Sequence, residues 1–103
     1  MGLNPVITIK RKETPDSGVR WYVIIRGEIY EPARLATTAP TLGQALSVAE
    51  AHLRWWGYNE IEVTRALANA YRSLRRRYGA GIMLEPSSPA QRAAADQLEP
   101  YPD

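Results

Sequence analysis

The sequence predicts an α+β fold: a three- or four-stranded antiparallel sheet packed by one helix, followed by a second amphipathic helix and a flexible tail. Up to about residue 38, apolar and polar residues alternate with the period of a strand, whereas beyond residue 41 apolar residues recur with the 3.6-residue period of a helix. A chain of 103 residues can bury one core. We therefore expect one domain over residues 1–83 and a Pro-rich acidic tail over residues 84–103.

A pair of strands opens the predicted sheet. Residues 6–12, VITIKRK, place isoleucines on one side and mostly polar residues on the other, as in a half-buried strand. Residues 15–18, PDSG, combine a proline with residues that favour a reversing turn. Residues 19–26, VRWYVIIR, are rich in β-branched and aromatic side chains and predict the strongest strand.

Glycine and proline indicate where the predicted third strand begins and where it lies in the sheet. Gly27–Glu28 fits a two-residue hairpin with glycine at its first central position. Residues 28–38 are expected to return as a third strand, and Pro32, which has no N–H to donate, places that strand at an edge or at a bulge. Residues 59–63, NEIEV, fit either a fourth short strand or the first turn of the next helix.

Capping residues delimit two predicted helices. The first lies between Thr41, a good N-cap with Gln44 three residues on, and Gly57, which can end a helix in the left-handed conformation. The second runs from about residue 64 to residue 78. Beyond it, the tail is expected to hold at most one or two helical turns around residues 90–98. The apolar stripe of the first helix consists of Leu42, Ala45, Leu46, Ala49, Leu53 and Trp56.

Composition excludes several kinds of site. The chain has no cysteine, so it has no disulfide, thiolate nucleophile or Cys-based metal site. No run approaches the roughly 18 apolar residues of a membrane span, and we expect a soluble, intracellular chain with no membrane partner. Charge is uneven: residues 1–83 carry a net charge of +5 and residues 84–103 a net charge of −3.

The predicted second helix carries an unusual density of arginines. Arg65, Arg72 and Arg76 form a stripe opposite its apolar face, Arg75 flanks that stripe, and the arginines from Arg72 onward have no carboxylate three or four residues away. Such cations stabilise a helix C-terminus and are often only solvated. They also suit phosphate or an acidic protein surface, or pairing with the acidic tail. The sequence leaves these alternatives open.

A second cationic surface is expected on the sheet. If Trp21, Val23 and Ile25 face the helix, the alternate residues between them face outward. That face can bind nucleic acid or a protein, unless the second helix covers it. Its predicted members are Arg20, Tyr22, Ile24 and Arg26, with Lys10, Lys12, Tyr30 and Arg34 beside them.

Two aromatic residues of the first helix complete the candidates. Trp55 projects about 100° from Trp56, so it either packs under the second helix or is an exposed anchor for a partner. His52 is the only histidine and lacks a recognisable nucleophile or fellow metal ligand. We predict no catalytic residue, no metal and no cofactor, and therefore no enzymatic activity.

A further set of features comprises the ETP turn at 13–15, the aromatic-Val strand, Gly43, Ala45, Ala49 and the Trp56-Gly57 stop. In these features part of the chain resembles small anti-CRISPR proteins of bacteriophages, in particular a type I-F inhibitor with three strands, an Ala-rich helix and a closing strand. The resemblance implies a non-catalytic inhibitor that occupies a surface on a CRISPR effector in the bacterial cytoplasm, and it carries over no binding residue.

Residues 6–53 contain the successive segments ITIKRK, RWYVIIRG, EIYEPAR and TLGQALSVAEAHL. In these segments the chain also resembles the arm-binding domains of phage-type integrases. The resemblance implies a three-stranded sheet set into the DNA major groove with a helix behind it. No recombinase catalytic domain follows, so the integrase role is not implied. By this resemblance the DNA-facing positions are Lys10, Lys12, Arg20, Tyr22 and Arg26.

The sequence therefore predicts a small non-catalytic binding protein of phage or mobile-element origin. The first hypothesis is an anti-CRISPR-like inhibitor or modulator of a host defence complex. The alternative is a DNA-binding protein that uses a basic sheet face and an Arg-rich helix. The partner is an acidic protein surface, a nucleoprotein complex or nucleic acid. The predicted partner-binding residues are Arg65, Arg72, Arg75, Arg76, Arg20, Tyr22, Arg26 and Trp55.

Overall fold

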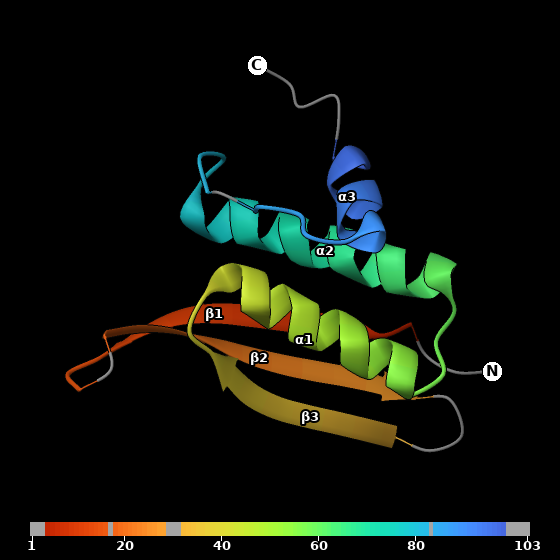
Figure 1. The fold of residues 1–103 in the computed structure, drawn as a ribbon, viewed down its shortest axis with the longest axis horizontal. Coiled ribbons are helices and arrows are strands. Elements are labelled where there is room, and N and C mark those ends of the chain that lie inside the picture. Colours follow the sequence, from red (N-terminus) through yellow and green to blue (C-terminus); the bar gives the residue numbers. More distant parts are fainter. Residues whose placement is uncertain (1–3, 17, 29–31, 83, 99–103) are drawn as a thin grey trace.

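The computed structural model describes residues 4–16, 18–28, 32–82 and 84–98. Within them the chain forms a two-layered α+β fold, with a three-stranded antiparallel sheet and three helices, which confirms the predicted class. Figure 1 shows α1 lying across the sheet, α2 beside α1, and α3 against α2. The elements are β1 (Val6–Thr14), β2 (Gly18–Glu28), β3 (Pro32–Ala39), α1 (Leu42–Trp55), α2 (Glu60–Tyr78) and α3 (Pro89–Asp96).

The strands lie in the order β1-β2-β3, and their register separates the residues by parity. Ile7 pairs with Ile25, which pairs with Leu35, so odd-numbered side chains share one face of the sheet. Ile9 and Val23 form the next row of that face. These odd-numbered side chains meet the helices, and the isoleucines and Val23 are buried. The core therefore lies between the helices and one face of the sheet only.

Local capping explains where α1 begins and ends. The Thr41 hydroxyl accepts a hydrogen bond from the backbone N–H of Gln44, at 3.1 Å. Beyond the helix, Gly57 adopts a φ of +101°, in the left-handed region that glycine tolerates best. Both predicted signals are confirmed, and the buried stripe of α1 includes Leu42, Ala45, Leu46, Ala49 and Leu53.

The ambiguous segment 59–63 belongs to α2, so the predicted start near residue 64 is four residues late. Asn59 is the N-cap: its side chain accepts from the backbone N–H of Glu62 at 2.8 Å. The Glu62 carboxylate in turn accepts from the Asn59 backbone N–H at 3.1 Å. This reciprocal capping box was visible in the sequence as Asn59 followed three residues later by Glu62.

The predicted hairpin at Gly27–Glu28 is wrong. Both residues continue β2, where they pair with Ala33 and Pro32, and the connection to β3 falls on residues 29–31, outside the described residues. Glycine is needed at position 27 for space, because a Cβ there would lie 2.5 Å from the Tyr58 hydroxyl and 2.9 Å from its ring. That hydroxyl accepts a hydrogen bond from the backbone N–H of Glu28.

Residues 84–98 pack onto the domain, so they are not the flexible tail expected from residue 84 onward. The one or two helical turns expected around residues 90–98 are confirmed by α3. Leu84 is buried, and α3 buries Ala90, Gln91 and Ala94. Ser88 caps α3, and Pro89 occupies its first turn, where a missing N–H does no harm. Small alanine side chains let α3 lie close to α2, although they gave only a weak helical signal in the sequence.

We predict that Gly27→Ala destabilises the fold by about 1–3 kcal/mol, because the added methyl group must displace the buried Tyr58 ring and its hydrogen bond to Glu28. Gly43→Ala is the matched control, since a Cβ at position 43 meets nothing within 4 Å and alanine favours a helix. Urea denaturation of both variants measures the difference. Equal midpoints would show that Tyr58 does not hold this end of the sheet.

Candidate functional site

The even-numbered side chains of the sheet form a face that no described helix covers. The helices take the odd-numbered face, so the alternative that the second helix would cover this surface is excluded for the described residues (Figure 1). We call this surface the open face. From one end to the other, its cross-strand rows are Lys12–Arg20, Lys10–Tyr22–Thr38, Thr8–Ile24–Ala36 and Val6–Arg26–Arg34.

The described residues of the open face are strongly cationic. Five are Lys or Arg, and Glu28 is their one carboxylate. Tyr22 is 37% exposed in the middle of the face, between cations at both ends. The cations are Lys10, Lys12, Arg20, Arg26 and Arg34. An exposed aromatic ring among unneutralised cations is suited to a partner that carries negative charge.

The two cross-strand cation pairs at the ends of the open face differ in their partners. The Lys12 ammonium lies 5.0 Å from the centre of the Tyr22 ring, and the Arg20 guanidinium donates to the Thr38 hydroxyl at 3.3 Å. Arg26 and Arg34, which pair directly across β2 and β3, make no hydrogen bond or ion pair within the described part of the chain. Their positive charge is left to solvent or to a ligand.

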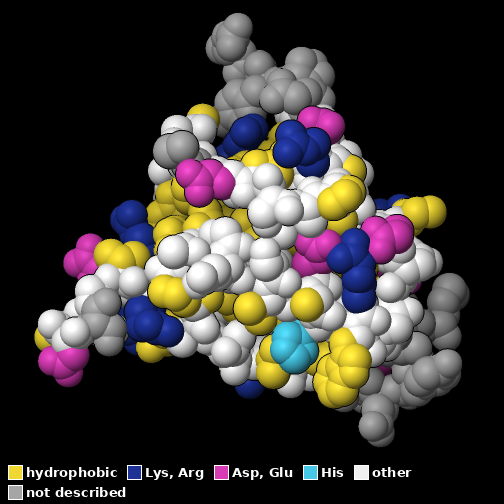
Figure 2. Space-filling view, viewed as in Figure 1, with side chains coloured by type: hydrophobic (Ala, Val, Ile, Leu, Met, Phe, Trp, Pro, Cys, Tyr) yellow, Lys and Arg dark blue, Asp and Glu magenta, His cyan; other side chains and the backbone are white. Residues whose placement is uncertain are grey.

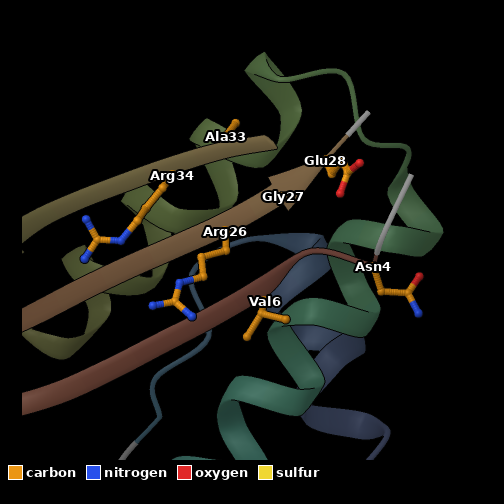
Figure 3. Close-up of a pocket in the computed structure, with 7 residues that line it drawn as sticks. All are labelled: Asn4, Val6, Arg26, Gly27, Glu28, Ala33 and Arg34. Atoms are coloured by element: carbon orange, nitrogen blue, oxygen red, sulfur yellow. The ribbon is translucent and has the colours of Figure 1, made fainter. Parts of the chain in front are cut away.

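A hollow of about 390 Å³ adjoins the Arg26–Arg34 pair (Figure 3). Figure 3 shows the two guanidinium groups extending side by side along the sheet, away from the Glu28 carboxylate. The rest of the lining is mainly apolar and small. The lining residues are Asn4, Val6, Arg26, Gly27, Glu28, Ala33 and Arg34.

The predicted arginine stripe lies in the helix layer, apart from the open face. Arg65, Arg72 and Arg76 are exposed on α2, and Arg75 is half-buried. Arg72 donates to the Asn69 side chain at 2.9 Å and to the backbone carbonyl of Gln97 at 3.4 Å. The C-terminal segment thus meets the stripe through a main-chain carbonyl. The structure therefore does not unite the α2 arginines with Arg20, Tyr22 and Arg26.

Trp55 is an exposed aromatic residue at the end of α1, and the residue as a whole is 80% exposed. It therefore does not pack under the second helix. The His52 ring is half-buried and lies 6.1 Å from the Trp55 ring in an edge-on arrangement. With Ala51 they border a hollow of about 240 Å³. On the face seen in Figure 2, the histidine lies beside hydrophobic side chains.

A buried polar cluster at the junction of α1 and α3 was missed from the sequence. Glu50 is only 4% exposed, and its carboxylate accepts from the Ser88 hydroxyl at 2.7 Å and from the Gln91 amide at 3.0 Å. Arg54 also bonds Glu50. The fully buried Gln91 side chain reaches Ser47 as well, at 3.2 Å. These bonds attach α3 to α1. No sequence motif marks them, because the partners lie about forty residues apart.

Charged partners extend this cluster to the start of α2. Arg54 donates two hydrogen bonds to the Glu60 carboxylate, at 2.8 and 2.9 Å. The bond to Glu60 raises the pKa of the Arg54 guanidinium, and the same bond lowers the pKa of Glu60. The arrangement is a clamp between α1 and α2. Its groups already bond one another, so it offers no free ligand site.

Within residues 4–16, 18–28, 32–82 and 84–98, no three His, Cys, Asp or Glu side chains gather where they could hold a metal ion. No helix in that part of the chain is long and apolar enough to cross a bilayer. Comparison with protein-family models, with curated proteins and with solved structures finds no match to this chain. The candidate site is therefore argued from its own geometry.

Tyr71 is a buried titratable group with a testable pH dependence. Its ring is fully buried, and its hydroxyl has no hydrogen-bond partner among the described residues. Burial, and then the negative charge of Glu50, raises the pKa of Tyr71 to about 12. The folded state thus holds the proton more tightly than the unfolded chain, in which the pKa is about 10. This contribution to stability is complete below pH 10 and is lost as the pH rises toward 12.

We predict that Tyr71→Phe unfolds at an equal or higher urea concentration than the parent at pH 7, because it removes a buried hydroxyl without a partner. It should also reduce the loss of stability between pH 9 and pH 11. Tyr22→Phe, on the open face, is the control and should keep that loss. A Tyr71→Phe protein that is more than about 1 kcal/mol less stable at pH 7 would contradict this assignment.

Proposed function

We propose that this chain is a non-catalytic nucleic-acid-binding protein whose binding surface is the open face. One observation carries the proposal: an antiparallel sheet with helices on one side presents five cations and the exposed Tyr22 on the other side, against the single carboxylate of Glu28 among the described residues. Polyanions bind such a surface because each neutralised phosphate releases condensed counterions.

The dimensions of the open face suit duplex DNA. Adjacent strands lie about 4.8 Å apart, so the outer strands are separated by about 10 Å, comparable with the roughly 12 Å width of the major groove. Positions 20 and 26 of β2 lie about 20 Å apart along the strand. With the strands lying along the groove, cations at the two ends of the face can meet phosphates at separate positions along the groove walls. The uncharged central row of Thr8, Ile24 and Ala36 then faces the base edges.

This proposal places Arg20, Tyr22 and Arg26 in the interface, with Lys10, Lys12 and Arg34 added. The likeness of residues 6–53 to integrase arm-binding domains supports the same surface. The α2 arginines stand on the opposite side of the sheet and serve as a comparison surface rather than as part of the interface.

The second candidate function is anti-CRISPR-like inhibition of a host defence complex in the bacterial cytoplasm, through an acidic protein or nucleoprotein surface. The 80% exposure of Trp55 favours it, because large aromatic side chains dominate protein interfaces. On this hypothesis Trp55 and the arginines Arg65, Arg72, Arg75 and Arg76 contact the partner. Affinity purification from a bacterial lysate, with and without nuclease, separates the two functions: this one requires a nuclease-resistant protein partner that Trp55→Ala loses.

We predict that binding to a 20-base-pair duplex weakens steeply with salt. A slope of about −4.5 in log affinity against log salt follows if the five cations of the open face neutralise phosphates. Lys12→Gln/Arg20→Gln should reduce the size of that slope by about 2, since each lost contact removes about 0.9. Fluorescence anisotropy between 50 and 200 mM salt measures both values.

The matched control is Arg72→Gln/Arg76→Gln, which removes the same charge from α2. It should change the slope by less than half as much, because exposed charges more than about 10 Å away are largely screened at 0.1 M salt. Equal effects of the two double variants would mean that charge alone, and not the open face, binds DNA. Absence of duplex binding at 50 mM salt would refute the proposed function.

A further inference from the structure

The end of the open face around Arg26 and Arg34 has features that general attraction to DNA does not require. Like charges directly opposite each other on neighbouring strands repel and destabilise a sheet. At the other end, Lys12 and Arg20 face each other too, but there the Tyr22 ring and the Thr38 hydroxyl engage them. Arg26 and Arg34 have no such contacts in the described part of the chain. A bound anion between these two guanidinium groups would remove the repulsion.

The charge of this pair matches a phosphate monoester. Two guanidinium groups carry +2, and a monoester phosphate carries about −1.5 to −2 near pH 7, whereas a phosphodiester carries −1. Figure 3 shows both groups extending the same way, so that two planar forks can bind one phosphate together. The one described carboxylate of the face, Glu28, lies in the opposite direction and does not compete for them.

The adjoining hollow is suited to the sugar and the base that a nucleotide carries beside its phosphate. Its volume of about 390 Å³ lies in the range of small-molecule sites, and Val6, Gly27 and Ala33 give it an apolar lining. At the far end Glu28 can accept hydrogen bonds from a sugar hydroxyl, and the Asn4 amide can pair with a base edge, as asparagine does with adenine. The hollow thus offers an anion end, an apolar middle and a polar end.

We propose that Arg26, Arg34 and this hollow form a binding site for a nucleoside 5′-phosphate. The two sources of this chemistry are a free nucleotide and a 5′-phosphorylated strand end. The assignment deepens the proposed function and rests on it in one respect: a strand end is reached only if the open face binds nucleic acid. The free-nucleotide part stands independently of DNA binding.

The first test titrates deoxyadenosine 5′-monophosphate into the ¹⁵N-labelled full chain in 0.15 M salt, with deoxyadenosine and inorganic phosphate as comparison ligands. We expect the amide signals of Gly27, Glu28 and Ala33 to shift, with the nucleotide binding more tightly than either of its parts. Arg26→Gln/Arg34→Gln should weaken nucleotide binding by about tenfold or more. Both side chains are exposed, so this variant is expected to fold, which its own spectrum checks.

The matched control is Lys12→Gln/Arg20→Gln, the other cross-strand cation pair of the same face, and it should keep nucleotide affinity within about twofold. Equal weakening by the two variants would overturn the site, because diffuse charge would then explain the binding. Inorganic phosphate that binds as tightly as the nucleotide would overturn the role of the hollow.

The second test compares two duplexes that differ only in a 5′-phosphate or a 5′-hydroxyl on a one-nucleotide overhang. A strand-end site requires the phosphorylated duplex to bind about fivefold more tightly or better, and Arg26→Gln/Arg34→Gln to abolish that preference. If the protein binds the nucleotide but shows no preference for the 5′-phosphorylated duplex, the site is assigned to free nucleotides. Duplex binding with neither nucleotide binding nor a preference refutes the site and leaves the proposed function intact. If the protein binds the nucleotide but no duplex, the proposed function is refuted, whereas the assignment of the nucleotide site stands.

Discussion

One-sided packing of the sheet is the constraint on which the rest of the molecule depends. The helices bury the odd-numbered residues of the strands, among them Ile9, Val23 and Ile25. Because side chains alternate along a strand, the even-numbered residues have to face away from the core. A sheet covered on both faces could not accept five cations there without a large desolvation cost. The same alternation that builds the core therefore builds the open face.

Polar contacts fix the helix layer on its side of the sheet. Tyr58 fits over Gly27 and binds the backbone of Glu28, and Tyr78 accepts a hydrogen bond from the backbone N–H of Arg11 at 2.7 Å. At the outer side, Glu50 bonds residues of α3 and so attaches α3 to the helices. The described chain after α2 therefore packs against the helices, and none of its described residues lies on the open face.

Local sequence patterns predicted most of the fold, whereas they did not predict contacts between residues that are distant in the sequence. Alternation in β1 and β2 and the Thr41 cap of α1 were readable because their physical causes lie within a few residues. The space that Tyr58 requires above Gly27, and the packing of α3, depend on contacts across the fold. The same holds for the candidate site: strand parity predicted Arg20, Tyr22 and Arg26 on the open face. Only the register showed Arg26 opposite Arg34 beside a hollow.

Chemical-shift mapping of the ¹⁵N-labelled protein with a 12-base-pair duplex tests most directly whether the open face is the binding surface. If it is, the largest changes fall on the amides and arginine side chains of β1, β2 and β3, around Lys10, Tyr22 and Arg26, while the outer sides of α1 and α2 keep their signals. Changes concentrated on α2 around Arg72 and Arg76, or at Trp55, with an unchanged sheet would contradict the account and move the functional surface to the helix layer.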